Sequence, residues 1–155
     1  MKLTREQKKK IRCYRNDIYP LNLYVARSSD IDLLNEYFVY YWTVEDMQED
    51  RPAKNNVESD ESSLGMTCMV KEPNGSKGIL IILEDLTKES FSKQVDVISH
   101  ESTHAATAIS NYLGLSIPSY DRGDEHYAYL LGWIAGCVAN AFITFKQEDD
   151  GTDRE

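Results

Sequence analysis

The pattern of apolar and polar positions predicts three strands. Residues 21–26 form a short apolar stretch, and two more such stretches cover residues 65–71 and 78–84. Between the last two lies Pro73-Asn74-Gly75-Ser76, which has the composition of a tight hairpin turn. Because the stretch GILIILED is apolar at nearly every position, we expect both faces of that strand to be covered.

Helical spacing predicts two helices in the first third of the chain. Thr4 and Gln7 can form a capping box for a short basic helix over residues 5–15. Residues 28–30, Ser-Ser-Asp, offer capping side chains for a second helix, and apolar residues then recur at helical spacing over residues 31–41. We expect the aromatic cluster that ends this helix to belong to the core rather than to a binding surface.

Two longer helices are predicted in the second half. Residues 45–63 are acidic and polar without an apolar period, which predicts a mobile loop. The first long helix spans residues 93–113 and ends at Gly114. The second spans residues 124–146, with Asp121 as a candidate cap. Two of its glycines, four residues apart at 132 and 136, are expected to allow close packing of the two long helices.

This order of elements predicts one domain of the α+β class over residues 1–155. Its core is expected within residues 64–146, flanked by the basic helix over 1–15 and the loop over 45–63. Residues 147–155 are acidic and are expected to form a disordered tail.

Composition narrows the range of partners. The net charge is −9, from 17 basic and 26 acidic residues, which argues against general nucleic-acid binding. The basic cluster over residues 1–15 could contact nucleic acid or an acidic partner, but a solvated helix face is the preferred interpretation. The three cysteines form no Cys-x-x-Cys pair, which is typical of a reducing compartment. No signal-like apolar segment begins the chain, and the apolar stretch 127–145 is interpreted as a buried helix rather than a membrane span. We therefore expect a cytoplasmic protein.

The most specific chemical signal is the sequence His100-Glu101-Ser102-Thr103-His104. On a helix, residues four apart share a face, so both imidazoles can reach one metal ion. Glu101 follows the first histidine directly, where its carboxylate can approach a metal-bound water. The motif therefore predicts two zinc ligands and a general base.

A catalytic zinc site needs a third protein ligand and an open fourth position. Glu125 lies 21 residues after His104, at the start of the next predicted helix, and is the preferred candidate. His126 is its rival, but it lies about 100° further round the helix. Asp124 and Asp121 are the remaining alternatives. A set of two histidines and one glutamate suits zinc.

With these residues the chain resembles the gluzincin class of zinc metallopeptidases. The pattern of Glu125 and Ala128 is similar to the ligand helix of small intracellular zinc peptidases of the ImmA/IrrE type. The resemblance covers residues 64–145. It implies a zincin-like fold, in which a small antiparallel or mixed sheet with a hairpin packs on the motif helix and the ligand-bearing C-terminal helix follows.

The chain departs from the larger members of this class at position 129. They often carry there an aspartate that orients the first zinc histidine, whereas this chain has Tyr129. Asp96 and Asp121 are the candidates for that orienting role.

The resemblance implies peptide-bond hydrolysis by a zinc-activated water, with Glu101 as general base. A further donor must stabilise the tetrahedral oxyanion. His126 and Tyr129 are the first candidates, and Tyr120 and Tyr127 are the others. An extended peptide substrate is expected to pair with an edge of the hairpin 65–84, as an added β-strand.

Two other classes of function compete with a peptidase. The first is a catalytically weak or inactive zincin scaffold that serves as a binding module. The intact Glu101 argues against it, because a purely structural site has no use for this carboxylate. The second is a regulatory peptidase that cleaves a repressor; the sequence shows no helix-turn-helix, so its contact with DNA would be indirect. The minimal size suggests a phage origin, which would place the protein in the host cytoplasm.

Overall fold

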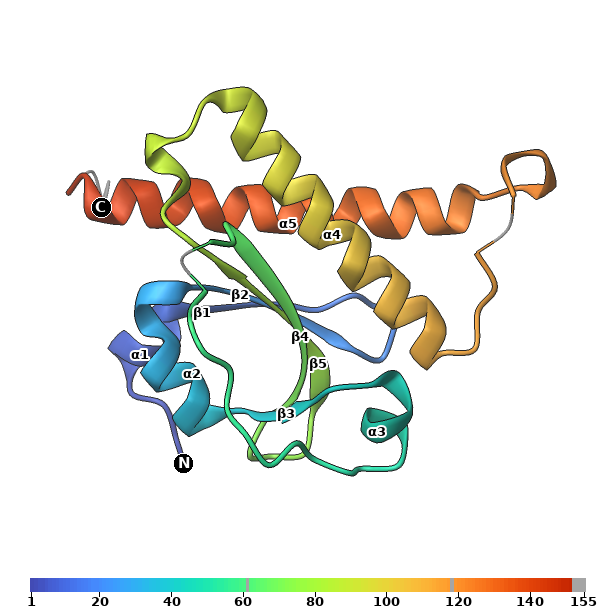
Figure 1. The fold of residues 1–155 in the computed structure, drawn as a ribbon, viewed down its shortest axis with the longest axis horizontal. Helices are drawn as coiled ribbons and strands as arrows, with labels where there is room; N and C mark the ends of the chain where they lie inside the picture. The colour runs from blue at the N-terminus through green and yellow to red at the C-terminus, as the bar shows by residue number, and fades with distance from the viewer. Residues whose placement is uncertain (61, 118, 152–155) are drawn as a thin grey trace.

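The computed structural model describes residues 1–60, 62–117 and 119–151, which form an α+β domain (Figure 1). Its described part holds a five-stranded mixed sheet and five α-helices. The elements in chain order are α1 (Arg5–Lys10), β1 (Ile11–Tyr14), β2 (Asn22–Arg27), α2 (Ile31–Tyr37), β3 (Val39–Tyr41), α3 (Val44–Gln48), β4 (Gly65–Lys71), β5 (Lys77–Leu83), α4 (Phe91–Tyr112) and α5 (Glu125–Asp149). Single turns of 3₁₀-helix precede α2, α4 and α5.

The sheet has the strand order β1-β2-β5-β4-β3. Strands β2 and β5 run parallel, and the other neighbours are antiparallel. The predicted hairpin is confirmed as β4 and β5, and β4 spans the predicted residues 65–71. Because β5 lies in the centre of the sheet, both of its faces are covered, as its apolar sequence predicted.

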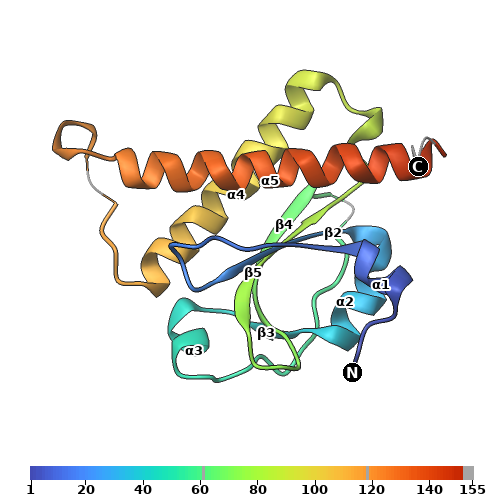
Figure 2. The same ribbon diagram turned by 180° about the vertical axis from the view of Figure 1, so that it is seen from behind.

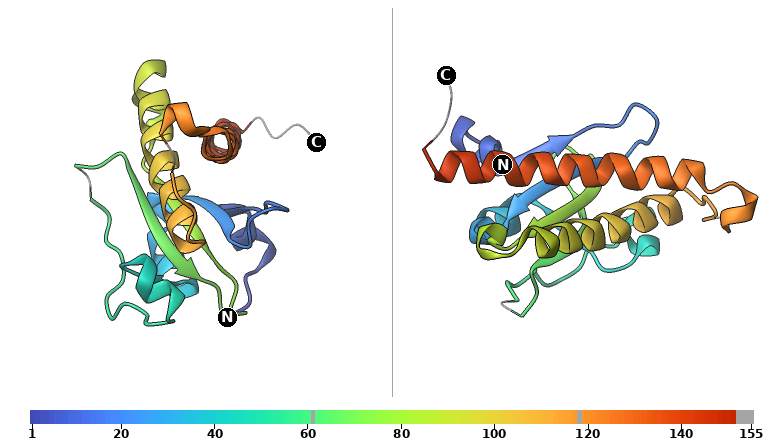
Figure 3. Two further views of the ribbon diagram at one scale, coloured as in Figure 1. Left: turned by 90° about the vertical axis from the view of Figure 1, so that its right-hand side faces the viewer. Right: turned by 90° about the horizontal axis from the view of Figure 1, so that it is seen from above.

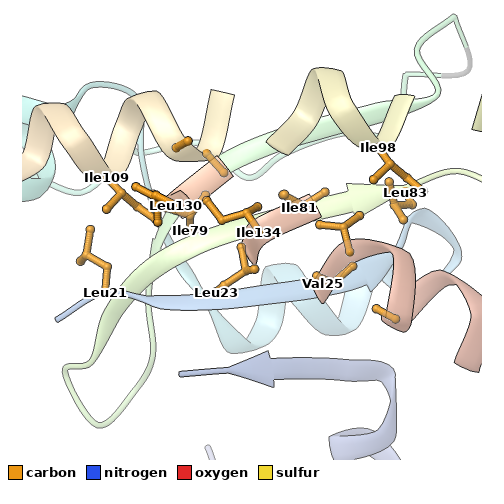
Figure 4. Close-up of a cluster of buried hydrophobic side chains, with 14 of the residues drawn as sticks. Leu21, Leu23, Val25, Ile79, Ile81, Leu83, Ile98, Ile109, Leu130 and Ile134 are labelled. Atoms are coloured by element: carbon orange, nitrogen blue, oxygen red, sulfur yellow. The ribbon is translucent and has the colours of Figure 1, made fainter. Parts of the chain in front are cut away.

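Two apolar layers cover the sheet. On one face Leu23, Val25, Ile79 and Ile81 are fully buried beneath α4 and α5, which cross each other on that side (Figures 2 and 4). On the other face alternate residues of the same strands pack against α2 and Val57. Burying a large aliphatic side chain of this kind stabilises a fold by about 1.5–3 kcal/mol, so the central strands anchor the domain.

Helix α4 carries the motif and lies directly on the sheet. Its N-cap is Ser90, whose hydroxyl accepts a hydrogen bond from the backbone N–H of Lys93, and Gly114 follows its end in the left-handed region at φ 68°. The middle of its buried side carries small residues, since Ser102, Ala105 and Ala106 are completely buried between the larger Ile98 and Ile109. Small residues let the helix axis approach the sheet closely, which brings the motif beside β4.

Helix α5 packs on α4 and β2 through one stripe of its surface. The buried members of this stripe are Leu130, Ile134, Val138, Ala141 and Phe145. By length and composition α5 could also cross a membrane, with a mean hydropathy of 1.6 over its most apolar window. Only 28% of that window is buried, along this single stripe, so the prediction of a buried helix holds for one face of α5 and the rest of its apolar surface faces outwards.

Two short strands replace predicted helix. The basic helix ends at Lys10, and Ile11–Tyr14 forms β1. This segment is a strand because it pairs with β2, so that its side chains alternate between the two faces of the sheet. The second helix ends at Tyr37, and Val39–Tyr41 forms β3. Aromatic and β-branched residues favour strands, and here Tyr40 and Tyr41 are buried on opposite faces.

The aromatic cluster is only partly in the core, since Phe38 is buried but Trp42 is 55% exposed. Further along, α3 occupies the start of the predicted loop over residues 45–63. The Thr43 hydroxyl accepts a hydrogen bond from the backbone N–H of Asp46 and so caps this helix.

The boundaries of α5 also differ from the prediction. It continues to Asp149, so the predicted tail over 147–155 begins as helix; residues 152–155 lie outside the described part. Asp121 does not cap it, because its carboxylate accepts a hydrogen bond from the Ser119 hydroxyl and Asp124 takes the N-cap position.

Candidate functional site

The two motif histidines lie one turn apart on the exposed side of α4. Their Nε2 atoms are 3.1 Å apart, and their rings are nearly perpendicular, at 78°. Two nitrogens bound to one tetrahedral zinc ion at roughly 2.0–2.1 Å lie about 3.3 Å from each other. The pair is therefore spaced as two ligands of a single metal ion.

Glu101 points into the space between α4 and β4 and lines the same groove as the two histidines. Its side chain is buried, with 6% exposure. Its Oε2 accepts a hydrogen bond of 2.6 Å from the hydroxyl of Thr67, which also lies 3.2 Å from the carbonyl oxygen of Glu101. A charge-assisted hydrogen bond of this kind is about twice as strong as a neutral one, so it fixes the carboxylate beside the histidines.

Gly65 makes room for the Glu101 side chain. A Cβ atom at position 65 would lie 2.7 Å from Cγ of Glu101 and 3.1 Å from its Cδ. Neither Gly65 nor Thr67 was identified by sequence reasoning as a site residue. The only signal for them was a glycine at the start of a strand, which often marks a close approach of another group.

A shallow groove of about 360 Å³ runs between β4 and α4 beside the histidines. Its lining consists of Ser63, residues 65–69, His100, Glu101, His104 and Ala108. Residues of β4 line one side of the groove and the motif helix lines the other, which is a suitable shape for an extended chain.

The outer edge of β4 is open along this groove. Strand β3 pairs only with Met69–Lys71, and within the described residues no strand pairs with positions 65–68 on that side. Backbone groups along β4 point alternately towards β5 and away from it, and the hydrogen bond from the backbone N–H of Glu84 to the carbonyl of Leu64 shows which residues face β5. This alternation directs the backbone groups of Gly65 and Thr67 away from β5, towards the open edge. The Gly65 carbonyl already accepts a hydrogen bond from the Ser63 hydroxyl, at 2.6 Å.

The other predicted site residues lie on the first turns of α5. Glu125, His126 and Tyr129 are all exposed there. Among the residues that the structure describes, no three His, Cys, Asp or Glu side chains are grouped to hold a metal ion, so Glu125 is not brought to the histidine pair. Near this end of α5, Tyr127 faces α4, and its hydroxyl lies 3.1 Å from that of Thr107. The roles of Glu125, His126 and Tyr129 stay predictions.

Comparison of the chain with protein-family models, curated proteins and solved structures gives no match. What the site can do therefore has to be inferred from its residues.

The candidates for orienting the first histidine differ in position. Asp96 lies one turn before His100 on α4 and accepts a hydrogen bond of 2.7 Å from the Lys93 ammonium. That ammonium, with a smaller contribution from His100, lowers the pKa of the Asp96 carboxyl. Asp96 is thus charged at neutral pH next to His100. Asp121 is bound by Ser119 on the connection before α5.

Cys68 also lines the groove but is not a nucleophile. Burial and the nearby Glu101 carboxylate raise the pKa of the Cys68 thiol to about 12. Since the thiolate is the reactive form, this side chain stays inert at neutral pH. The reactive chemistry of the groove therefore rests on the histidine pair and Glu101.

Proposed function

We propose that this protein is a zinc-dependent metallopeptidase. The observation that carries the proposal is the convergence of His100 and His104 at 3.1 Å beside a buried Glu101 carboxylate that a strand hydroxyl anchors. A purely structural pair of histidines would need neither a buried carboxylate in the same groove nor a groove large enough for a peptide.

Each residue has a defined task in this proposal. The histidines would hold a zinc ion through their Nε2 atoms, and a bound zinc would supply a Lewis acid and an acidified water. Glu101 uses Oε2 to accept the Thr67 hydrogen bond. Its Oε1 then takes a proton from the attacking water and delivers it to the leaving amine, which balances the hydrolysis.

The substrate is a peptide bound as an added strand. The outward N–H and C=O groups at positions 65 and 67 offer backbone hydrogen bonds along the groove. The carbonyl of Gly65 would exchange its Ser63 hydroxyl for the N–H of a peptide. With a net charge of −9, a protein or peptide is a better substrate class than nucleic acid.

The third ligand is assigned to Glu125, as the sequence predicts. In the structure this residue lies on the first turn of α5 and is exposed. Coordination would require this first turn to reorganise when the metal binds. His126 and Tyr129 are proposed as oxyanion donors on the same turns. Cysteines without a disulfide agree with a cytoplasmic location, which we also propose.

Metal analysis tests the ligand set. Elemental mass spectrometry on purified protein should find one zinc per chain in the wild type and in Glu101→Gln. His100→Ala and His104→Ala should lose it, and Ser99→Ala, at an exposed neighbouring position of α4, is the matched control. Glu125→Ala separates the assignments, since zinc retained in that variant would move the third ligand to another residue.

Cleavage of a peptide library tests the activity. Wild type should cleave, and Glu101→Gln, with zinc still bound, should be slower by about 10²–10⁴-fold. Zinc in the wild type without any cleavage that depends on Glu101 would favour the inactive scaffold. Absence of zinc even after reconstitution would exclude both.

A further inference from the structure

The outward face of α5 lacks charge. Residues 126–145 contain no Asp, Glu, Lys or Arg, although 28% of the chain is charged. One stripe of this helix is buried on α4 and β2, but Ala128, Gly132, Gly136 and Ile143 are exposed on the opposite side. Figure 3 shows α5 along the outside of the domain, and no other described helix or strand lies over that side. An uncharged helix face of this length is typical of a contact surface.

The two glycines have no role within a single copy of the chain. A Cβ atom at Gly132 or at Gly136 would meet nothing within 4 Å, and neither has a positive φ. The prediction that they let the two long helices pack closely is therefore wrong. Glycine is the least favourable residue in a helix interior apart from proline. Small residues at these two positions make sense if another backbone approaches from outside.

The outward stripe has the same pattern in both directions. It consists of the exposed residues Glu125, Ala128, Gly132, Gly136, Ile143 and Lys146, and it is bordered by Ala135 and Ala139, which are half-buried against the core. When the sequence of the helix is read backwards from the point between Ala135 and Gly136, Gly132 takes the place of Ala139. The same reversal places the long Ile143 opposite the short Ala128. At the ends, the carboxylate of Glu125 comes opposite the ammonium of Lys146.

We propose that α5 pairs antiparallel with α5 of a second copy of this chain, through this stripe. A twofold axis would pass between Ala135 and Gly136, so that each surface contacts its own copy. The small central residues allow the helix axes to approach to about 8 Å, the close end of the usual range. In that arrangement the helix dipoles are antiparallel, and each Glu125 faces the other copy's Lys146.

The charges of Glu125 and Lys146, at the two ends of the stripe, favour a second copy of the chain over a lipid surface as the partner of this face. Neither Glu125 nor Lys146 has an ion-pair partner among the described residues, whereas Arg12, Arg27 and Lys10 do. An antiparallel copy supplies the opposite charge at both ends of the stripe. A lipid surface would supply neither charge, and the buried stripe of the same helix keeps α5 on the domain.

The pairing is separate from the proposed zinc chemistry except at one residue. Glu125 cannot bind zinc and face Lys146 of a second copy at the same time. Zinc content and association are therefore measured independently, with association measured in the presence of a chelator.

Analytical ultracentrifugation of the full chain, from low micromolar to submillimolar concentration, tests the pairing. The wild type should associate to a dimer. Gly136→Leu should abolish dimerisation, because the added side chain separates the helices. Ser92→Leu, at an exposed position of α4, is the matched control for added apolar surface and should dimerise as the wild type does.

Charge reversal tests the antiparallel register. Glu125→Lys and Lys146→Glu should each weaken the dimer roughly tenfold at low salt, since two symmetry-related pairs become repulsive. The double variant should recover wild-type association. Equal weakening in the single and double variants would overturn the register.

Two results would overturn the pairing itself. One is a wild type that is monomeric over the whole concentration range. The other is a Gly136→Leu variant that dimerises like the wild type. Co-sedimentation of the monomer with phosphatidylcholine–phosphatidylglycerol vesicles would assign the face to a membrane instead.

Discussion

Replacing Gly65 by alanine tests how the general base is positioned. The new methyl group would lie 2.7 Å from Cγ of Glu101 and 3.1 Å from its Cδ. The closest atom, Cγ, is in the middle of a side chain that is buried and bound by Thr67 at 2.6 Å, so movement of the carboxylate end alone does not relieve the overlap. Either Glu101 leaves its position or the α4 backbone moves away from β4.

The expected size of the effect follows from two opposing terms. Insertion of a methyl group into a well-packed site costs about 1–3 kcal/mol. Replacement of glycine by alanine stabilises through the unfolded state by about 0.4–1 kcal/mol. The net loss is about 1–2 kcal/mol, equivalent to a fall in Tm of about 2–8 °C for a domain of this size. Displacement of the base should also slow Glu101-dependent cleavage by about 10²-fold or more, with zinc content unchanged.

Urea denaturation of the chelator-treated protein measures the first quantity, and peptide cleavage with elemental analysis measures the second. Gly132→Ala is the matched control, since its Cβ meets nothing within 4 Å. At low micromolar concentration it should raise the stability by about 0.8–1 kcal/mol, the opposite sign. A Gly65→Ala variant as stable and as active as the wild type would refute the inference that this close contact positions Glu101.

Three further predictions concern residues of β4 and β5. Thr67→Val should lower the free energy of unfolding by about 1.5–3 kcal/mol at neutral pH, because it removes a hydrogen bond to the charged Glu101, and Thr67→Ser should retain most of it; equal losses in urea denaturation would contradict this. The Cys68 thiol, whose pKa is raised to about 12, should resist iodoacetamide in the folded protein at mildly alkaline pH, whereas the exposed Cys13, whose pKa partial burial and Glu72 also raise, should react faster; peptide mapping separates both from Cys137. Labelling of Cys13 and Cys68 at the same rate would contradict the burial of Cys68. Because the pKa of Cys68 is raised in the folded state, its contribution to the free energy of unfolding is complete below the unfolded pKa and is lost as the pH rises towards 12. Gly78→Ala places a Cβ 2.4 Å from a backbone oxygen of β2 and should cost about 3 kcal/mol or more, and a normal urea midpoint would show that the two strands are less closely paired.

The longer elements could be predicted from sequence, and the short ones could not. β4 and α4 carry several periods of their pattern and have clear ends in a hairpin turn and Gly114. β1, β3 and α3 have four, three and five residues. A pattern this short fits helix and strand equally well, so tertiary pairing decides the conformation.

The same distinction applies to the site. His100, Glu101 and His104 were predictable because a helix alone fixes their relative positions. The roles of Gly65 and Thr67 depend on how β4 packs against α4, across more than thirty residues of intervening chain. No local pattern contains that information.

The position of Glu125 was partly contained in the sequence. The apolar residues at Leu130, Ile134 and Val138 define the face of α5 that is buried on the core. At about 100° per residue, Tyr127 falls on this face and Glu125 falls about 200° away from Tyr127, on the outside of the helix. The spacing of 21 residues after His104 fits a third ligand, whereas the helical phase opposes it.

Zinc binding by Glu125 therefore has a structural consequence. The first turn of α5 would have to unwind or rotate when the metal binds, because a straight helix keeps residues 125 and 134 on nearly opposite faces. Amide hydrogen exchange over residues 125–130 should then change on addition of zinc, and the change should be absent in His100→Ala. If zinc binds and exchange in this turn stays the same, then the third ligand lies on another element, and Glu125 is left free for the pairing of α5.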